Sequence, residues 1–294
     1  MTAIARVGVV VKSGLAAAAD VLADIAAWLE RRGVEPVLEA ETAQLARVAG
    51  RWPTASRDEL ARLVDLVVVL GGDGTLLGMA GRIALAGADI PILGVNYGSL
   101  GFLTEVTLPE IEASLQSVLD GTATLEERMM LRGRVLRDGQ ARADRVALND
   151  IVISRGALSR IVDLAIWVGD EFVTRVKGDG LIVASPTGST AYNLAAGGPI
   201  VHYAVDALVL TPIAPHTLTN RPVVIPAATE VRVQATRENG GEEVVATFDG
   251  QLRVALGPTD VVSIRRADRP LRLVRASART YFEVLREKLK WGQR

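Results

Sequence analysis

The pattern of apolar residues in this 294-residue chain changes near Leu125, and this change constrains the fold more than any single motif does. Before Leu125, largely apolar runs alternate with longer segments that have helical spacing. The apolar runs are 4–11, 66–70 and 90–95, and the helical segments are 15–32, 75–85 and 109–119. Strands that are apolar on both faces and separated by helices are typical of a parallel sheet covered on two sides. We therefore predict an α/β domain over residues 1–125.

After Leu125 the expected strands are short and bounded by turns. Asp138-Gly139 separates two such strands, and so does Gly169-Asp170. Further short strands are expected in EVRVQAT, EEVVATFDG, QLRVALG, DVVSIRR and PLRLVRA. Many short strands at this spacing favour a layered sheet, so we predict a β-sandwich domain over residues 126–274.

The last segment, TYFEVLREKLKW, has helical spacing again. Its apolar residues Phe282, Leu285 and Leu289 fall on one face of the predicted helix. Because an apolar face on a helix needs a partner, we expect residues 275–294 to pack back on the first domain.

Composition excludes several classes of site. The chain has no cysteine, which rules out disulfides, thiolate-bound zinc, iron–sulfur clusters and a cysteine nucleophile. With only two histidines, a histidine-rich metal site is not expected, and we predict no metal-binding residue in the chain. The formal net charge of -1 gives no indication of a nucleic-acid or membrane partner, and we expect a cytoplasmic protein.

The stretch LVVVLGGDGTLLGMA places one acid, Asp73, among glycines where a buried strand meets a helix. Ligands of parallel sheets bind beyond the carboxyl ends of the strands, and a helix N-terminus favours phosphate. An acid there is explained if it binds a hydroxyl, accepts its proton or acts through Mg²⁺. The alternative is a tight turn with Asp73 as the helix N-cap. Neither a Walker A loop nor the dinucleotide fingerprint is present, since Leu77 stands where the fingerprint needs its third glycine.

Two further stretches carry polar groups in unusual settings. Asp179 lies between glycines and is followed by the loop 185–190, whose small hydroxyl residues and glycine can bind a sugar or phosphate. The alternative is a turn in which Ser189 or Thr190 caps a helix. Asn149 and Asp150 set an amide beside a carboxylate, a pair that can bind ribose or adenine or simply form a turn.

Taken together, these stretches resemble the NAD kinases. The matching segments are GGDGTLL, GVNYGSLGFLTE, ALNDIVISRG, GDGLIVASPTGSTAYNLAAGGPIV, LTPIAPHTLTNRPVVIP and the short FDGQ, in the family's order. GGDGT alone is shared with diacylglycerol, sphingosine and phosphofructo-kinases, whereas segments 96–103 and 178–201 resemble NAD kinases specifically.

The resemblance implies a fold and an activity. The fold is an N-terminal α/β domain of the diacylglycerol kinase and phosphofructokinase kind, a C-terminal β-sandwich domain, and a last segment that returns to the first domain. The activity is transfer of the γ-phosphoryl group of ATP to the 2′-hydroxyl of the adenosine ribose of NAD, which makes NADP. The family also implies Mg²⁺ or another divalent cation with ATP, and a homodimer or homotetramer.

By the same resemblance, Asp73 is the catalytic base and Asn149 with Asp150 grips the dinucleotide. Asp179 is expected at the nicotinamide half, while Arg160 and Lys177 either pair with the diphosphate or are solvated surface charges. The full set of implied nucleotide-binding residues is Gly72, Asp73, Gly74, Gly78, Asn149, Asp150, Arg160, Lys177, Asp179, Thr187, Thr190, Ala191, Tyr192, Asn193, Leu194, Ala195, Ala214 and Gln251.

Two other functions remain open at this level. A lipid kinase of the diacylglycerol or sphingosine type shares GGDGT, but segments 96–103 and 178–201 argue against it. A non-catalytic NAD sensor needs the binding residues alone, and Asp73 argues against it because binding would tolerate an asparagine there.

Overall fold

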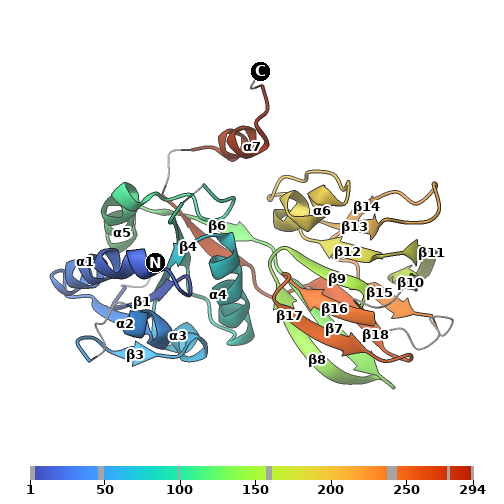
Figure 1. The fold of residues 1–294 in the computed structure, drawn as a ribbon, viewed down its shortest axis with the longest axis horizontal. Coiled ribbons are helices and arrows are strands. Elements are labelled where there is room, and N and C mark those ends of the chain that lie inside the picture. Colours follow the sequence, from blue (N-terminus) through green and yellow to red (C-terminus); the bar gives the residue numbers. More distant parts are fainter. Residues whose placement is uncertain are drawn as a thin grey trace. The chain divides into compact units, whose positions relative to one another are not determined.

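The computed structural model describes residues 4–45, 50–98, 100–156, 161–236, 244–276 and 279–292. The chain forms two compact units. The first consists of Met1–Glu127 and Leu271–Arg294, and the second of Arg128–Pro270. The chain thus enters the second unit after Glu127 and returns to the first at Leu271 (Figure 1).

The first unit is built on a seven-stranded sheet in the order β3-β2-β1-β4-β5-β19-β6. Its strands are β1 (Arg6–Val11), β2 (Glu35–Glu39), β3 (Thr54–Ala55), β4 (Leu66–Gly71), β5 (Ile92–Asn96), β6 (Thr124–Arg128) and β19 (Leu271–Arg275). The pairings from β3 through to β19 are parallel. The parallel α/β character predicted from the fully apolar strands is therefore confirmed, and every residue of β4 is buried.

Helices cover both faces of this sheet. The helices of the first unit are α1 (Ala19–Glu30), α2 (Ala40–Leu45), α3 (Arg57–Leu63), α4 (Asp73–Leu85), α5 (Ile111–Leu119) and α7 (Tyr281–Leu289), with short 3-10 turns η1 (Ala16–Ala18) and η2 (Leu108–Glu110). Leu29 of α1 and Leu115 of α5 share one core with alternate strand residues such as Val9 and Val68. On the opposite face, a Cβ at Gly8 of β1 would lie 3.2 Å from Leu60 of α3.

The second unit is a sandwich of two antiparallel six-stranded sheets, in the orders β11-β10-β15-β18-β7-β8 and β14-β13-β12-β9-β16-β17. The strands are β7 (Leu131–Arg137), β8 (Gln140–Ala147), β9 (Asp150–Arg155), β10 (Val162–Val168), β11 (Glu171–Gly178), β12 (Gly180–Ala184), β13 (Ala207–Ile213), β14 (Val223–Pro226), β15 (Val231–Ala235), β16 (Val244–Phe248), β17 (Leu252–Leu256) and β18 (Val261–Arg266). Ile153 and Phe248 of one sheet share a core with Leu164 and Ile264 of the other. The predicted β-rich second half is confirmed.

The turns of this unit follow the glycines. Asp138 and Gly139 have φ values of 51° and 76° and join β7 to β8 as a tight hairpin, as predicted. Gly169, with φ 59°, lies in the turn between β10 and β11. Outside the sandwich core, the 3-10 turn η3 (Thr187–Thr190) and the short helix α6 (Tyr192–Ala195) belong to a segment whose Ala196 and Val201 pack on a second buried cluster around Ile182.

Two expectations about the end of the chain are wrong in detail. The sequence predicts that the strand in PLRLVRA belongs to the β-rich half, but it is β19 of the first unit's sheet, where Leu273 pairs with Ile92 of β5. A short apolar strand carries no local sign of which sheet it joins. In α7 the buried residues are Val284 and Leu285, whereas Phe282 is 56% exposed, so the buried stripe lies on the Val284 side.

No helix in the described ranges has the length and apolar character needed to cross a membrane.

Candidate functional site

Asp73 is the first residue of α4, at the carboxyl end of the central strand β4. The N-cap residue is Gly72, with φ -121°, and the helix has no side-chain cap. The alternative in which Asp73 caps the helix is therefore wrong, because its side chain points away from the first-turn amides to other partners. A carboxylate in the first turn is favoured by the helix dipole.

The carboxylate of Asp73 holds the loop that follows β5. Its Oδ1 accepts hydrogen bonds from the backbone N–H of Leu103 (3.1 Å), the N–H of Thr104 (3.0 Å) and the Thr104 hydroxyl (3.0 Å). Its Oδ2 accepts one, from the N–H of Phe102 at 2.8 Å. Oδ1 is thus fixed by three donors, while Oδ2 keeps a lone pair for a further donor.

Glycines around Asp73 divide into two kinds. A Cβ on Gly101 would lie 2.1 Å from Asp73 Oδ1 and 2.3 Å from Thr104 Oγ1, so the loop reaches the carboxylate only because this residue lacks a side chain. A Cβ on Gly72 or Gly74 would meet nothing within 4 Å. Those two glycines fill no internal gap, and the space beside them is open to a ligand.

The loop is also held from its far end. Glu105, next to Thr104, forms an ion pair with Arg275 of β19, and both side chains are largely buried. Arg279 donates to the backbone carbonyl of Glu105 at 3.2 Å, and Arg275 donates to the carbonyl of Arg279. The returning segment of the chain therefore anchors the loop that orients Asp73.

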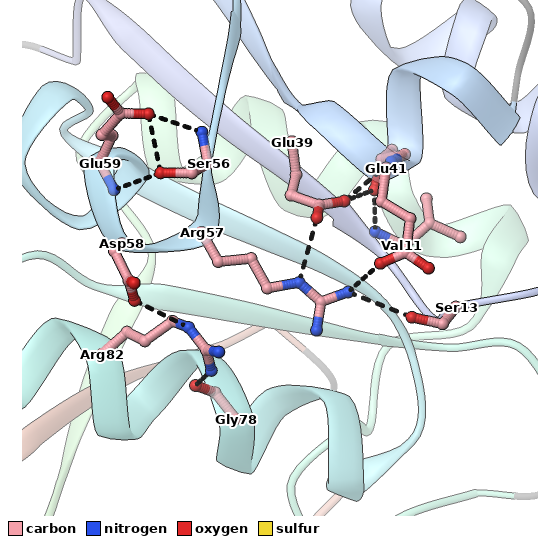
Figure 2. Close-up of polar contacts among 11 residues, drawn as sticks. Val11, Ser13, Glu39, Glu41, Ser56, Arg57, Asp58, Glu59, Gly78 and Arg82 are labelled. Atoms are coloured by element: carbon pink, nitrogen blue, oxygen red, sulfur yellow. Dashed lines mark hydrogen bonds and ion pairs between the residues drawn. The ribbon is translucent and has the colours of Figure 1, made fainter.

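The ends of β1 and β2 are tied together beside this site (Figure 2). The N–H of Val11 donates to the Thr42 hydroxyl at 3.0 Å, and Thr42 donates from its N–H and its hydroxyl to Glu39 at 2.8 and 2.6 Å. Arg57 lies 3.3 Å from Glu39 and is also close to Glu41. The charge of Arg57 is thus compensated within the protein.

Lys12 follows β1 at this edge. A Cβ on Gly71 would lie 3.1 Å from Lys12 Cβ, which places the lysine stem beside the glycine turn. Lys12 is exposed, and its ammonium forms no ion pair with another described residue. Sequence reasoning did not single out Lys12, since only the neighbouring strand end reveals its position.

Gly78, one of the implied binding residues, accepts a hydrogen bond from Arg82 on its carbonyl at 2.7 Å (Figure 2).

In the second unit, Asn149 and Asp150 stand at the start of β9 on a backbone whose polar groups are all paired. Asp249, in the turn between β16 and β17, accepts the N–H groups of Leu148 (2.8 Å), Asn149 (2.7 Å) and Asp150 (3.2 Å). The Ser185 hydroxyl donates a hydrogen bond to the carbonyl of Leu148, and the Ser185 N–H donates one to the carbonyl of Asn149. The N–H of Asp249 donates to the carbonyl of Asp150 at 3.0 Å.

Gly188 closes this arrangement from the other side. A Cβ there would lie 2.0 Å from the carbonyl oxygen of Asn149, so only glycine lets the 185–190 loop lie against the Asn149 backbone. The N–H of Gly188 donates to the Ser185 hydroxyl at 3.1 Å. Two stretches that lie 37 positions apart in the sequence, at Leu148 and Ser185, are thus one structural feature.

Asp150 and Asp249 form a pair of neighbouring acids. Burial raises the pKa of the Asp150 carboxyl to about 7, and the charge of Asp249 adds to the shift. Burial also raises the pKa of Asp249, to about 6, against three backbone hydrogen bonds that lower it. Near neutral pH, Asp150 can therefore donate as well as accept a hydrogen bond.

Residues 187–195 divide into buried and exposed members. Asn193 is 0% exposed, and its side-chain N–H groups donate to the carbonyls of Ser189 and Pro199, each at 3.0 Å. Its Oδ1 accepts from the Thr211 hydroxyl at 2.6 Å. Both N–H donors of this implied ligand residue are thus used within the unit. Thr187 is buried, Thr190, Ala191 and Leu194 are half-buried, and Tyr192 and Ala195 are exposed.

The remaining implied residues lie at the end of β11 and in the segments that follow β11, β13 and β16. Asp179 is paired with Arg155 at 2.8 Å. The Lys177 side chain is 59% exposed, and its ammonium lies 3.5 Å from the buried Asp163. Ala214 has a φ of 42° and is exposed, as is Gln251. Arg160 lies outside the described residues. Within the described parts of the chain, no group of three or more His, Asp or Glu side chains is arranged to hold a metal ion.

Comparison with known proteins agrees with this arrangement. Residues 7–123 match the model of the ATP-NAD kinase N-terminal domain, and residues 148–276 match that of the ATP-NAD kinase C-terminal domain. NAD kinase from Syntrophotalea carbinolica is 46% identical over 289 residues, 98% of this chain and 99% of that protein. NAD kinase from Geobacter metallireducens is 48% identical over 274 residues, 93% of this chain and 94% of that protein.

Solved structures show the same fold. Yeast NADH kinase complexed with NADH superimposes with a TM-score of 0.89 at 23% identity, covering 100% of this chain and 89% of that one. An NAD kinase from Archaeoglobus fulgidus in complex with ATP has a TM-score of 0.76 at 26% identity, covering 97% and 98%. The matches to the two bacterial relatives cover 98% and 93% of this chain, and so extend over both units. The chain therefore belongs to the NAD kinase family of enzymes.

Proposed function

We propose that this enzyme transfers the γ-phosphoryl group of ATP to the 2′-hydroxyl of the adenosine ribose of NAD, forming NADP and ADP. The observation that carries the proposal is the state of Asp73: Oδ1 is fixed by three donors and Oδ2 retains an open lone pair beside Gly72 and Gly74. Such a carboxylate is oriented before the substrate arrives. The relatives named NAD kinase support the choice of substrates.

In the proposed step, Oδ2 of Asp73 accepts the proton of the ribose 2′-hydroxyl while that oxygen forms a bond to the γ-phosphorus. The bond from the γ-phosphorus to the β,γ-bridging oxygen breaks, and its electron pair leaves on ADP. Phosphoryl transfer depends mainly on alignment and charge neutralisation, so the fixed direction of the Asp73 carboxylate matters more than its basicity.

The donor phosphates are proposed to lie at the N-terminus of α4, where helix amides favour anions. Lys12, beside Gly71 and without an ion-pair partner among the described residues, supplies positive charge there. The open space beside Gly72 and Gly74 fits a divalent cation that the ATP phosphates carry, because Mg²⁺ is commonly held mostly by substrate phosphates. When bound, the ion supplies charge neutralisation for the phosphates.

Recognition of the dinucleotide is assigned to the second unit. The side chains of Asn149 and Asp150 are proposed to bind adenine and ribose groups, and the exposed ring of Tyr192 offers a stacking surface. Asp179 is proposed at the nicotinamide half. Lys177 would have to exchange its contact with Asp163 for the diphosphate.

We further propose a homodimer or homotetramer in the cytoplasm. The edge strand β14, in which Val223 and Val224 are about half exposed, supports a subunit contact.

The test is an assay of the purified protein with NAD, ATP and Mg²⁺, in which NADP is measured with an NADP-specific dehydrogenase. We expect NADP formation that requires all three components. Product formed only with a diacylglycerol or sphingosine acceptor would assign a lipid kinase instead. Binding of NAD without any NADP would assign a sensor.

A further inference from the structure

Asp249 lies in the FDGQ segment and has no role in the proposed function, but its carboxylate contacts a backbone segment about one hundred positions away in the sequence. It accepts the three consecutive N–H groups of residues 148–150 at 2.7 to 3.2 Å. The contact depends on the antiparallel pairing of β16 with β9, in which Phe248 lies opposite Ile151. The acid therefore acts on the segment that presents Asn149 and Asp150.

The backbone N–H and C=O groups of residues 148–150 are all hydrogen-bonded. The carboxylate of Asp249 accepts the three N–H groups. The three carbonyls accept hydrogen bonds from Ser185 and from the N–H of Asp249. Buried backbone groups need such partners, so the peptide is held in one conformation. The side-chain amide of Asn149 is half-buried and has no hydrogen bond to another described residue.

The turn itself does not require this carboxylate. Asp249 and Gly250 have φ values of 50° and 67°, and the β7–β8 turn repeats this conformation in Asp138 and Gly139, at 51° and 76°. The Asp138 side chain is exposed and accepts no hydrogen bond from a described residue. An aspartate thus suits the left-handed position in both turns, but only Asp249 is directed at a functional segment.

We propose that Asp249 is a positioning residue for dinucleotide binding, which holds the 148–150 backbone so that the side chains of Asn149 and Asp150 face the nucleotide together. It is not a catalytic residue, because it acts through the two residues that it orients. The inference rests on the proposed function in one respect, the assignment of Asn149 and Asp150 to NAD.

The experiment compares four variants of the full chain, Asp249→Asn, Asp249→Ala, Asp138→Asn and Asp138→Ala. The two positions have the same backbone conformation, so each Asp138 variant is a control for turn strain at Asp249. NAD and ATP dissociation constants are measured by calorimetry, and hydrogen exchange of the 148–150 amides by NMR.

For Asp249→Ala we expect NAD binding at least ~10-fold weaker and faster exchange of the three amides, since all three hydrogen bonds are lost. The NAD affinity of Asp249→Asn should lie between those of wild type and Asp249→Ala, because its remaining oxygen can still accept the N–H groups of Asn149 and Asp150. ATP binding should stay within about twofold, as should NAD binding in both Asp138 variants. If Asp249→Ala does not fold, Asp249→Asn decides alone.

The outcomes separate the two proposals. Unchanged NAD affinity in a folded Asp249 variant whose amides exchange faster would overturn the positioning role while leaving the kinase proposal intact. If wild-type protein binds NAD but makes no NADP, the kinase proposal fails and the same affinity series still decides the role of Asp249. A wild-type protein that does not bind NAD overturns both.

Discussion

The carboxylate of Asp73 receives two hydrogen bonds from Thr104, one from its backbone N–H and one from its hydroxyl, each at 3.0 Å. One residue thereby links the end of β4 to the loop after β5, whose far end is held by the ion pair between Glu105 and Arg275. In the proposed mechanism, Asp73 has two functions, since both of its oxygens order the loop and Oδ2 also accepts a proton.

Replacement of Asp73 separates these functions when it is compared with a change at Thr104. Asp73→Asn should lower kcat at least ~10²-fold while most NAD affinity is kept, because a positioned base is removed. Thr104→Val keeps the carboxylate and removes one buried hydroxyl donor, so it should lower the free energy of unfolding by about 1 kcal/mol and kcat by less than ~10-fold. Steady-state kinetics and chemical denaturation measure both; similar kcat values for the two variants would contradict the base role.

Gly101→Ala should disable the enzyme through steric displacement of Asp73. The added Cβ would lie 2.1 Å from Asp73 Oδ1, so the carboxylate or the loop must move, and a shift of about 1 Å can cost ~10²-fold in rate. Gly81→Ala is the control: Gly81 lies in α4, the helix that begins at Asp73, and a Cβ added there meets nothing within 4 Å. That control should keep its activity and gain roughly 0.5–1 kcal/mol in free energy of unfolding. An active Gly101→Ala enzyme would show that the loop is not needed in this position.

The Glu105–Arg275 pair should be energetically important, unlike an exposed ion pair in the same unit. Arg275→Met leaves a buried carboxylate without its main partner and should lower the free energy of unfolding by about 3–5 kcal/mol. The contact between Arg82 and the exposed Asp58 is the comparison, and Arg82→Met should cost only ~0–1 kcal/mol (Figure 2). Double-mutant cycles by urea denaturation give the two coupling energies, and equal values would contradict the anchoring of the loop.

Stability should fall with rising pH because of Asp150. Its pKa is raised to about 7, so between the ordinary aspartate value and pH 7 the folded state binds more protons than the unfolded chain. Stability is therefore lost as the pH rises through 7. Asp150→Asn removes this term, and its free energy of unfolding relative to wild type should increase by on the order of 2 kcal/mol from pH 5 to pH 8. Asp138→Asn, on an exposed turn, should follow wild type at both pH values; a pH-independent difference for Asp150→Asn would refute the raised pKa.

The sequence alone predicts the α/β first half and the β-rich second half because apolar periodicity is a local signal. The Asp73 turn was also placed at the end of its strand, but the helix was expected to begin at Thr75 and begins at Asp73. That difference of two residues decides the capping question. The helical spacing of Leu76 and Leu77 is visible in the sequence, whereas glycines around Asp73 hide where the helix starts.

Other parts of the site depend on long-range pairing and have no local signal. The contact of Asp249 with Asn149 follows from the register of β9 against β16, and the contact of Gly188 with Asn149 follows from close backbone approach. Asn193 was expected to contact the ligand, yet its side-chain N–H groups are used in the interior. A motif identifies which residues gather in a region, but not which of them face outward.

The position of β19 has a consequence for synthesis on the ribosome. In the first unit's sheet β19 stands between β5 and β6, so β6 gains its neighbour only after residues 271–275 have been translated. A nascent chain therefore completes the whole sandwich of Arg128–Pro270 while Ile92 of β5 still lacks its β19 partner. The Asp73 loop gains its Arg275 anchor at the same late moment. Truncated chains that stop before Leu271 should thus be substrates for chaperones and proteases rather than partly active enzymes.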